Sequence, residues 1–446
     1  TDVAALADGR AERSRVLRQL GREQTPENAH ALLLKVGHWG PGHNPHPYRL
    51  GLSLRDPDLE VPPLPEEERL DLTGMPAYAI DDEGNEDPDD ALSWDGERLW
   101  VHVADVAALV RPGSELDRAA RERGANLYLP ERTVNMLPAG VTARLGLGLQ
   151  EVSPALSFAL TFGADGGISH VDLHPSRVRV TRLSYGEVEG RLGEEPFATF
   201  AALAERHLER RLARGATQID LPEVRIRVGE DGRVSIRPLE RNRARALVTE
   251  AMLMTGEAVG RFAQEHVVPF PFTTQPPPDG LPKGEGLAAM HARRRQMKRS
   301  QKRAQAEPHS GLGLEVYAQA TSPLRRYLDL ALHQQLRAWL AGEPVLEVED
   351  MLARVGESDL LSGQVRKAER QSNLHWTLVY LLQNPDWRGE GVVVEHRERF
   401  TVVLIPELAF EARVRGGAWE LNTVLTLRCT GVDLPALSAR FQVVKD

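Results

Sequence analysis

The stretch that decides the fold of this chain is YAIDDEGNEDPDDAL, residues 78–92. Gly84 and Asn85 favour a turn, and Pro88 favours extended geometry at the residue before it, so the segment is predicted to be an irregular loop and not a helix. Such a loop can bring together carboxylates that would point to opposite faces of a straight strand. Four of its acidic residues follow the spacing D-x₅-D-x-D-D: Asp81, Asp87, Asp89 and Asp90.

This acidic segment predicts a metal site. Like charges repel at close range unless water or a cation screens them. All-oxygen ligation suits a hard cation, Mg²⁺ or Mn²⁺, which keeps waters and takes its remaining ligands from a substrate phosphate. A solvated acidic loop is the simpler alternative, and the spacing of a calcium-binding EF-hand loop fails here. Apolar segments on both sides of the loop favour the metal site, because a solvated loop does not need to lie between core strands. Tyr78 to Ile80 precedes the loop, and after it the hairpin signal Asp95-Gly96 leads to an alternating strand, Leu99 to Val103.

Composition restricts the class of protein. A formal net charge of −9 is not typical of a general nucleic-acid binder, so any RNA-binding charge must be concentrated in a groove. Between Arg293 and Arg303, seven of eleven residues are Lys or Arg, which is either such a surface or a solvated face. The single cysteine, Cys429, excludes an internal disulfide and predicts a reducing cytoplasm. No apolar run predicts a membrane span, and neither a nucleotide cofactor nor a state beyond a monomer is predicted.

The spacing D-x₅-D-x-D-D-A, followed by VHVADVAALV (101–110), resembles the catalytic RNB domain of the ribonuclease II/R family. The resemblance implies a metal-dependent exoribonuclease that binds single-stranded RNA with a free 3′ end. It also implies processive 3′→5′ hydrolysis to nucleoside 5′-monophosphates, with magnesium held by the four aspartates and Mn²⁺ as a possible substitute. Such an enzyme acts in RNA degradation and turnover.

The resemblance implies an α+β fold in three parts. A small helical module with its linker is expected over residues 1–70, the RNB catalytic domain with a mixed sheet and surrounding helices over 71–385, and an OB-fold barrel over 386–446. One helix is expected from Val3 to Leu20 and another from Thr25-Pro26 to about Val36, in a helix-turn-helix or winged-helix module.

The linker over 54–72 is proline-rich and acidic. Members of the family usually carry two cold-shock domains ahead of the RNB domain, which a segment with helical signals cannot supply. The chain is therefore expected to be a short bacterial member without that pair. A more open channel mouth, which would let the enzyme run closer to or into duplex RNA, is the corresponding hypothesis.

Several RNA contacts are implied by the resemblance. NLYLPERTVNMLP (126–138) carries Tyr128, which is expected to stack on bases near the 3′ end. Tyr185 and Glu250 are expected to contact ribose 2′-hydroxyls, and Ile226 falls where relatives carry a stacking phenylalanine. The residues alone favour a core position for Tyr128, and Glu250 could equally be a solvated residue on a helix over 246–265.

The block YAQATSPLRRYLDLALHQQL (317–336) predicts a helix with Ser322 as its cap and Pro323 in its first turn. Arg325 and Arg326 would then lie at the positive end of the helix dipole, where they cost stability unless an anion is near. This predicts a phosphate site. The resemblance implies that Arg325 approaches the scissile phosphate, whereas Arg326 either holds RNA or pairs with Asp329. Buried leucines are expected every four residues, with Gly342 ending the helix: Leu324, Leu328, Leu332 and Leu336.

The C-terminal part begins with a helix expected from about Asp350 to Asn384, whose Glu369 is either close to the RNA 3′ end, as the resemblance implies, or an exposed helix residue. Phe400 and Phe410 are either RNA-facing or core residues of the barrel. Five short apolar runs predict its strands: 390–396, 400–406, 410–415, 423–433 and 438–445.

The expected mechanism gives Asp81 and Asp90 as the main metal ligands, with Asp87 acting directly or through water. Asp89 would hold a second metal or position the attacking water, and Arg325 would stabilise the developing charge. A catalytically inactive RNA-binding regulator on the same scaffold is the alternative. A nuclease that acts on DNA is a second one.

Overall fold

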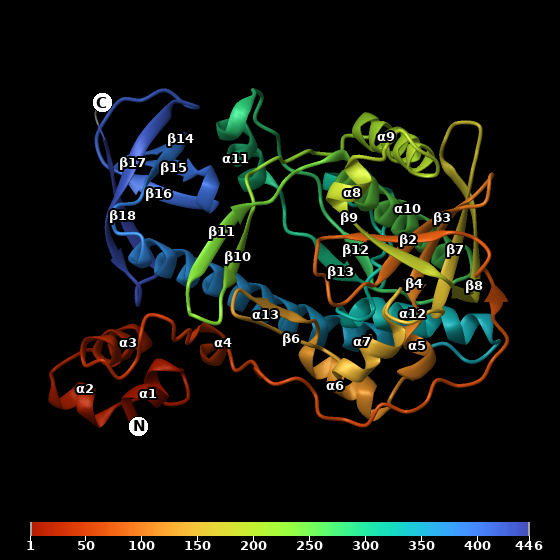
Figure 1. Ribbon diagram of the computed structural model, residues 1–446, viewed down its shortest axis with the longest axis horizontal. Helices are drawn as coiled ribbons and strands as arrows, with labels where there is room; N and C mark the ends of the chain where they lie inside the picture. The colour runs from red at the N-terminus through yellow and green to blue at the C-terminus, as the bar shows by residue number, and fades with distance from the viewer. Residues whose placement is uncertain (1, 445–446) are drawn as a thin grey trace.

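The computed structural model describes residues 2–444 and has the predicted α+β class (Figure 1). Its largest element is a seven-stranded mixed sheet with the order β1-β8-β7-β4-β3-β2-β9. The β1–β8 and β2–β9 pairs are parallel and the other neighbours are antiparallel. The strands are β1 (Leu70–Asp71), β2 (Ala77–Asp81), β3 (Asp90–Trp94), β4 (Leu99–Ala104), β7 (Ser153–Phe162), β8 (Ile168–Val178) and β9 (Val180–Ser184).

The acidic stretch forms the loop between β2 and β3, as predicted from its turn residues. The predicted hairpin at Asp95-Gly96 joins β3 to β4, and Gly96 adopts a φ of +102° that other residues rarely take. Because side chains alternate along a strand, Ile80 and Leu92 pack on one face of the sheet while Ala79 and Ala91 pack on the other.

Helices cover both faces of the sheet (Figure 1). The Ile80 face packs on α9 (Phe197–Ala213) and α10 (Arg243–Glu265), with α8 (Tyr185–Glu189) beside them. The Ala79 face packs on α5 (Val106–Leu109), α6 (Glu115–Arg123), α7 (Ala139–Leu145) and the first turns of α12 (Tyr327–Leu340). The predicted helix over 246–265 is thereby confirmed as the main part of α10.

The start of α12 corrects one expectation. The helix begins at Tyr327, so Arg325 precedes it, Arg326 occupies the cap position in an extended conformation, and Ser322 is not its cap. The carbonyl of Arg325 accepts a hydrogen bond from the backbone N–H of Asn126 at 3.0 Å, and this contact with another segment holds the residue outside the helix. The four predicted leucines are buried, and Gly342 follows the helix with a φ of +66°.

The N-terminal module contains α1 (Asp2–Ala7), α2 (Arg15–Gln19), α3 (Pro26–Lys35) and α4 (His46–Arg49). The single helix expected from Val3 to Leu20 is wrong, because the chain turns at Gly9, with a φ of +74°, and a new helix starts at the Ser14 cap. A Cβ at position 9 would lie 3.0 Å from the backbone of Arg49, so close packing favours glycine there. The predicted Thr25 cap of α3 is confirmed, since its hydroxyl accepts from the Asn28 N–H at 3.2 Å.

The long helix α13 (Val348–Gln383) runs between the N-terminal helices and the C-terminal strands (Figure 1). Those strands form an antiparallel sheet with the order β16-β15-β14-β17-β18, which confirms the five predicted strands. They are β14 (Arg388–Arg397), β15 (Phe400–Ile405), β16 (Phe410–Val414), β17 (Val424–Asp433) and β18 (Ser438–Val443). Residue 445 of the last predicted run lies outside the described residues.

Smaller elements surround the sheet: the hairpin of β5 (Leu127–Leu129) and β6 (Arg132–Val134), the hairpin of β10 (Val224–Val228) and β11 (Val234–Pro238), the pair β12 (Phe272–Thr274) and β13 (Gln301–Arg303), the helix α11 (Gly286–Gln296), and the 3₁₀ turns η1 (Ser310–Leu312) and η2 (Pro406–Leu408). Within residues 2–444, no helix combines the length and apolar character needed to cross a bilayer.

Candidate active site

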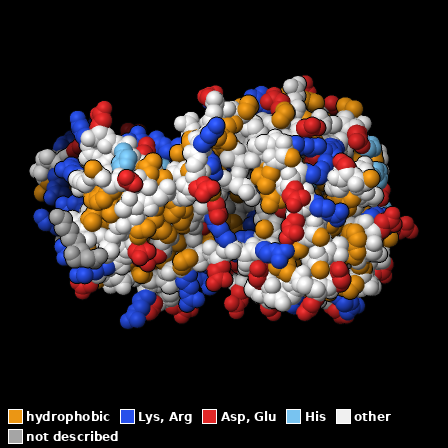
Figure 2. Space-filling view, turned by 90° about the horizontal axis from the view of Figure 1, so that it is seen from above, with side chains coloured by type: hydrophobic (Ala, Val, Ile, Leu, Met, Phe, Trp, Pro, Cys, Tyr) orange, Lys and Arg blue, Asp and Glu red, His pale blue; other side chains and the backbone are white. Residues whose placement is uncertain are grey.

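A cavity of about 1000 Å³ opens at the acidic loop. Asp81 at the end of β2, Asp87 in the loop, Tyr128 on β5 and Arg325 before α12 all line it. The structure therefore brings to one cavity four residues that the sequence separates by up to 244 positions. Seen from above, the molecule is hollowed between two lobes, and both acidic and basic side chains lie along this hollow (Figure 2).

Asp81 and Asp90 influence each other electrostatically. Burial raises the pKa of Asp90 to about 7, and the negative charge of Asp81 adds to the rise. Burial also raises the pKa of Asp81, and Asp87 acts in the same direction. Asp81 accepts hydrogen bonds from the Asn85 amide at 2.5 Å and the Asp82 N–H at 3.1 Å, which offset its burial only in part. Two carboxylates whose ionised forms are disfavoured in this way are suited to a cation.

The donor set fits Mg²⁺ or Mn²⁺. Magnesium is commonly bound through one or two carboxylates and keeps several waters or phosphate oxygens as its other ligands. Among residues 2–444, no group of three or more His, Cys, Asp and Glu side chains is placed to hold an ion. Asp81 and Asp90 would hold such an ion only together with water or phosphate oxygens.

Asp89 is engaged with Arg325. Its side chain is 1% exposed, and its two oxygens accept from the Leu324 N–H at 2.9 Å and from Arg325 Nε at 3.0 Å. Burial raises the pKa of Asp89 well above its usual range. Burial acts to lower the pKa of Arg325, but the neighbouring carboxylates, Asp89 foremost, raise it above the ordinary value. Arg325 keeps 38% of its side chain exposed, so Asp89 holds a charged guanidinium at the wall of the cavity.

Arg326 forms the structural pair that was one of its two alternatives. Its Nε and Nη2 donate to the two oxygens of Asp329 at 3.0 and 2.6 Å. The Asp329 carboxylate also accepts from the Ser322 N–H at 3.0 Å, so the pair fixes the turn before α12. Two neighbouring arginines thus have different surroundings: Arg325 borders the cavity, and Arg326 binds its own helix.

Tyr128 connects the acidic loop to α13. Its hydroxyl donates to Asp87, and its backbone N–H donates to the carboxylate of Glu369 at 2.9 Å. Burial raises the pKa of Glu369 and of the Tyr128 hydroxyl. Tyr128 nevertheless remains 39% exposed, so a ring face is accessible from the cavity. Its role as a stacking platform stays a prediction.

Tyr185 lies beside the aspartates, whereas Glu250 does not. The guanidinium of Arg245 sits 4.1 Å from the Tyr185 ring centre and also pairs with Asp82 at 2.5 Å. Burial raises the pKa of Tyr185, with further contributions from Asp81 and Asp90.

Glu250 faces the interior between α9 and α10. It accepts from His207 Nδ1 at 2.7 Å and from Arg211 Nε at 3.0 Å, and it is 5% exposed. The solvated helix face considered for this residue is wrong, because two cationic partners compensate its burial. Its predicted contact with a ribose hydroxyl gains no support from this position.

Two further cavities extend from the acidic loop toward the C-terminal sheet. The first, about 1170 Å³, lies between β10, α13 and the C-terminal strands, and Ile226 lines both it and the cavity of the aspartates. Glu369 also lines it, together with Phe410. The second, about 660 Å³, shares Glu411 and Arg413 with the first. The shared residues show that the three cavities adjoin one another in series.

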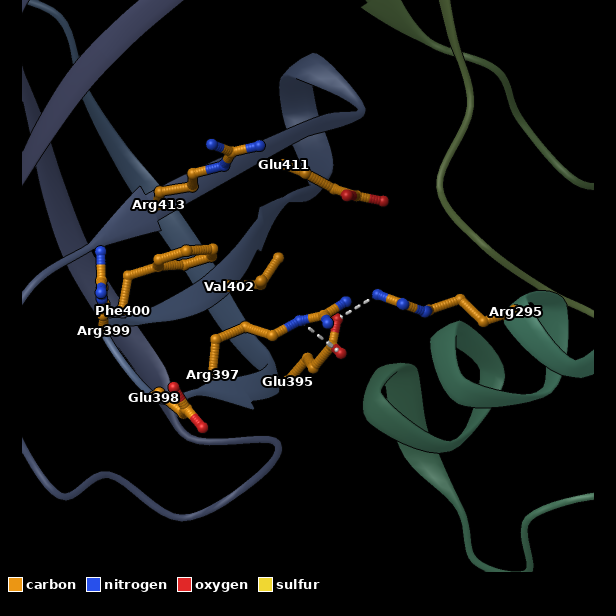
Figure 3. A pocket seen from close by; sticks show the side chains of 9 residues that line it. All are labelled: Arg295, Glu395, Arg397, Glu398, Arg399, Phe400, Val402, Glu411 and Arg413. Carbon is orange, nitrogen blue, oxygen red and sulfur yellow. Dashed lines mark hydrogen bonds and ion pairs between the residues drawn. The ribbon is translucent and has the colours of Figure 1, made fainter.

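The outermost cavity, drawn in Figure 3, combines aromatic and basic side chains. The guanidinium of Arg413 lies 5.1 Å from the centre of the Phe400 ring. From the opposite wall, Arg295 on α11 reaches across to Glu395 at 2.5 Å (Figure 3). Phe400 is half-buried, so it is neither a full core residue nor a free surface ring.

The basic run over 293–303 spans three successive segments of the structure. It is divided between α11, a loop and β13, and ion pairs engage several of its members, for example Arg299 with Asp359 at 3.8 Å. Lys302 is largely buried and donates to Thr273 Oγ1 at 2.6 Å. Two of its arginines line the cavities, Arg294 and Arg295.

Three residues of the site had no signal of their own in the sequence. Asn126 donates from Nδ2 to Asp87 at 3.0 Å and is 3% exposed. Asp82 pairs with Arg225 and Arg245. Asp56, from the linker, lines the cavity. The sequence indicated Asn126 only through its closeness to Tyr128, and Asp82 only through its closeness to Asp81. No sequence feature indicated that Asp56 belongs to the site.

Comparison with known families agrees with this architecture. Residues 69–281 and 284–342 match the family described as the RNB domain, and residues 387–444 match the RNase II-type exonuclease C-terminal S1 domain. Residues 2–45 match the family described as a double HTH domain, which supports the helix-turn-helix alternative for the N-terminal module. An uncharacterized ribonuclease of Synechocystis is 35% identical over 432 residues, covering 89% of this chain and 64% of that protein. The chain thus spans less than two thirds of that relative.

Solved structures share the fold. The Dss1 exoribonuclease of Candida glabrata, an active site mutant, superposes with a TM-score of 0.83 at 20% identity, over 99% of this chain and 66% of that one. Mycoplasma genitalium RNase R, in complex with ribose-methylated single-stranded RNA, gives a TM-score of 0.74 at 19% identity, over 84% and 72% of the two chains. At these identities the likeness concerns the fold.

Proposed function

Because the chain belongs to the RNB-domain family of ribonuclease II-type proteins, we propose that it is a metal-dependent 3′→5′ exoribonuclease that degrades single-stranded RNA processively to nucleoside 5′-monophosphates. The observation that carries this proposal is the position of Asp81 at the end of β2 and of Asp90 at the start of the neighbouring strand β3, with Arg325 close enough to influence the pKa of both carboxylates. A site for a cation beside a site for a phosphate is what hydrolysis of a phosphodiester requires.

In the proposed reaction, Asp81 and Asp90 hold the metal, with Asp87 acting directly or through water. When bound, Mg²⁺ supplies a lowered pKa for a water molecule and offsets negative charge on the phosphate. Arg325 uses the guanidinium nitrogens that Asp89 leaves free to bind a phosphate oxygen, and Asp89 prevents the side chain from turning away. Asp89 already accepts two hydrogen bonds, one of them from Arg325. We therefore add a third role, the orientation of Arg325, to the two predicted for Asp89 from the sequence, which are to hold a second metal or to position the attacking water.

The three adjoining cavities support a path for a single strand. A strand that crosses the C-terminal sheet at Phe400 and Arg413 would pass Phe410 and Ile226 and reach Tyr128 beside the aspartates. The accessible ring of Tyr128 would stack on a base near the 3′ end, with a contribution of about 1–3 kcal/mol. Tyr185, which directly follows the β9 residue paired with Asp81, would contact the ribose and help to distinguish RNA from DNA.

An inactive RNA-binding regulator on the same scaffold remains the alternative function. The presence of all four aspartates, and the contact of Asp89 with Arg325, favour the enzyme, because a binding protein gains nothing from clustered carboxylates that repel a phosphate backbone.

The test is degradation of 5′-labelled single-stranded RNA with Mg²⁺, with Mn²⁺ or with EDTA, resolved on a sequencing gel. We expect the full-length strand to be replaced directly by a short 5′-labelled remnant, and only with metal. Asp90→Asn should abolish this turnover while the protein still binds RNA in EDTA. Binding without cleavage under every divalent ion would contradict the proposal and favour the regulator. A DNA strand of the same sequence serves as the control for sugar specificity.

A further inference from the structure

The hairpin β5–β6, which carries Tyr128, is held between the linker and α13. Leu50 and Leu52, which follow α4, and Leu54 at the start of the linker pack on one apolar cluster in the hairpin and α13: Leu127, Leu129, Val134, Val365 and Ala368. At the turn of the hairpin, Glu131 accepts from Asn44 Nδ2 at 2.8 Å and from Trp376 Nε1 at 2.6 Å. The segment that joins the N-terminal module to the sheet therefore packs directly against the hairpin that carries Tyr128.

A series of hydrogen bonds leads from this linker to the acidic loop. Asp56 accepts from the backbone N–H of Asn135 at 2.7 Å and from its side-chain amide at 3.1 Å. These two contacts fix the amide of Asn135, whose Oδ1 accepts from Asn126 Nδ2 at 3.4 Å. The two N–H groups of this Asn126 nitrogen are shared among three acceptors, of which Asp87 at 3.0 Å is nearer than the Tyr128 hydroxyl at 3.3 Å.

Asn126 has no freedom to turn away from Asp87. Its Oδ1 accepts from the Met136 N–H at 2.7 Å, so the amide cannot flip without losing that bond. Its backbone N–H donates to the carbonyl of Arg325 at 3.0 Å. One buried residue thus connects Asp87 in the acidic loop with Arg325 in the turn before α12.

We infer that Asn126 and Asp56 are positioning residues, through which the linker holds Asp87 in the orientation needed for the metal site. The inference rests on the proposed function, since it assigns a purpose to the orientation of Asp87. Partners of this kind fix the direction of a ligand's lone pairs and so set the affinity of the site. The neutral amide of Asn126 does so without adding a positive charge that would compete with the cation.

The test compares Asn126→Ala, Asp56→Ala and the control Asp58→Ala, which removes another exposed carboxylate from the same linker. Mn²⁺ affinity is measured on the metal-free protein by electron paramagnetic resonance, and kcat and KM are measured on single-stranded RNA. Removing a residue that hydrogen-bonds to a metal ligand typically lowers metal affinity or activity by about 10- to 100-fold. We expect Asn126→Ala to lower both Mn²⁺ affinity and kcat by about that factor. Asp56→Ala should change less in the same direction, and Asp58→Ala should equal the wild type.

A purely structural role would lower thermal stability and leave Mn²⁺ affinity and kcat of the folded protein unchanged, which would overturn the inference. Asp56 is exposed, so Asp56→Ala gives a folded variant even if Asn126→Ala does not fold. If the wild-type protein binds Mn²⁺ and degrades RNA, and the Asp56→Ala variant has the same Mn²⁺ affinity, the positioning role is refuted and the proposed function is not. Wild-type protein that neither binds Mn²⁺ nor degrades RNA would refute the proposed function.

Discussion

Arg325 and Arg326 are adjacent in sequence, yet the structure gives their side chains different partners. Arg325 donates through Nε to buried Asp89 and lines the cavity. Arg326 places two nitrogens on Asp329, three residues further along the chain. A planar guanidinium can bind a carboxylate and a phosphate at once, which a lysine ammonium does less specifically.

We therefore expect Arg325→Lys to lower kcat by about 10²- to 10³-fold, as the loss of one donor to a developing oxyanion does, with a smaller change in KM. Arg326→Lys is the matched control, and it should lower the melting temperature more than it lowers kcat. Steady-state kinetics and thermal unfolding of both variants check this. Equal losses of kcat would mean that both arginines act on RNA.

At the scale of elements, α9 and α10 are joined by a buried cluster of charges. His207 on α9 donates from both ring nitrogens, to Glu250 at 2.7 Å and to Glu257 at 3.1 Å. Burial acts to lower the pKa of His207, but the hydrogen bonds with the two glutamates raise it above its ordinary value of 6.5. Burial acts to raise the pKa of Glu250, and its bonds to His207 and Arg211 nevertheless lower it. The imidazolium therefore contributes to folding as the cation between two carboxylates.

His207→Ala removes that cation and is expected to lower the free energy of unfolding by about 3–5 kcal/mol, the usual cost of breaking a buried ion pair. Because the folded pKa of His207 is raised, its contribution is fully present below 6.5 and is lost as the pH rises through the folded value. Urea unfolding of both proteins, at pH 6.5 and below and at clearly alkaline pH, should show a difference that shrinks with rising pH. A difference independent of pH would mean that His207 is neutral in the folded protein.

At the scale of the whole molecule, the C-terminal sheet and the acidic loop are connected by three adjoining cavities, and α13 lines the middle one. Because the chain is acidic overall, attraction for an RNA strand would depend on where its arginines lie and not on its net charge. Arg295 and Arg413 lie at the outermost cavity, where Arg413 approaches the Phe400 ring. In the proposed RNA path, this surface would affect how a long strand is held and would leave the bond-breaking step unchanged.

Phe400→Ala should weaken binding of long single-stranded RNA by about 1–3 kcal/mol, the typical contribution of one stacked base. The value of kcat at saturation should not change, because the cavity lined by Phe400 shares no residue with the cavity at the acidic loop. RNA too short to reach the C-terminal sheet provides the control, and its KM should be unaffected. Fluorescence anisotropy and steady-state kinetics on a series of RNA lengths measure both effects, and a fall in kcat for short RNA would contradict the proposed path.

Features that depend on neighbouring residues could be predicted from the sequence. The spacing of the aspartates, the Gly-Asn turn, the Thr25 cap and the alternating or four-residue apolar patterns predicted the acidic loop, α3, α10, α13 and the five C-terminal strands. These features follow from local backbone preferences and from the need to bury one face of each element. The long helix expected at the N-terminus was wrong because the packing of Gly9 on Arg49 joins segments 40 positions apart.

Only the tertiary structure decided which charges meet. Asp89 and Arg325 are 236 positions apart and Asp87 and Asn126 are 39 apart, so no local pattern indicates either contact. Asn126 donates a hydrogen bond to the Arg325 carbonyl, and α12 starts only at Tyr327. Glu250 lies in the interior, where it pairs with His207 and Arg211 of α9. The sequence by itself determined which groups are available for metal and phosphate chemistry. Folding determined their partners, because burial makes each charge depend on the nearest opposite charge in space.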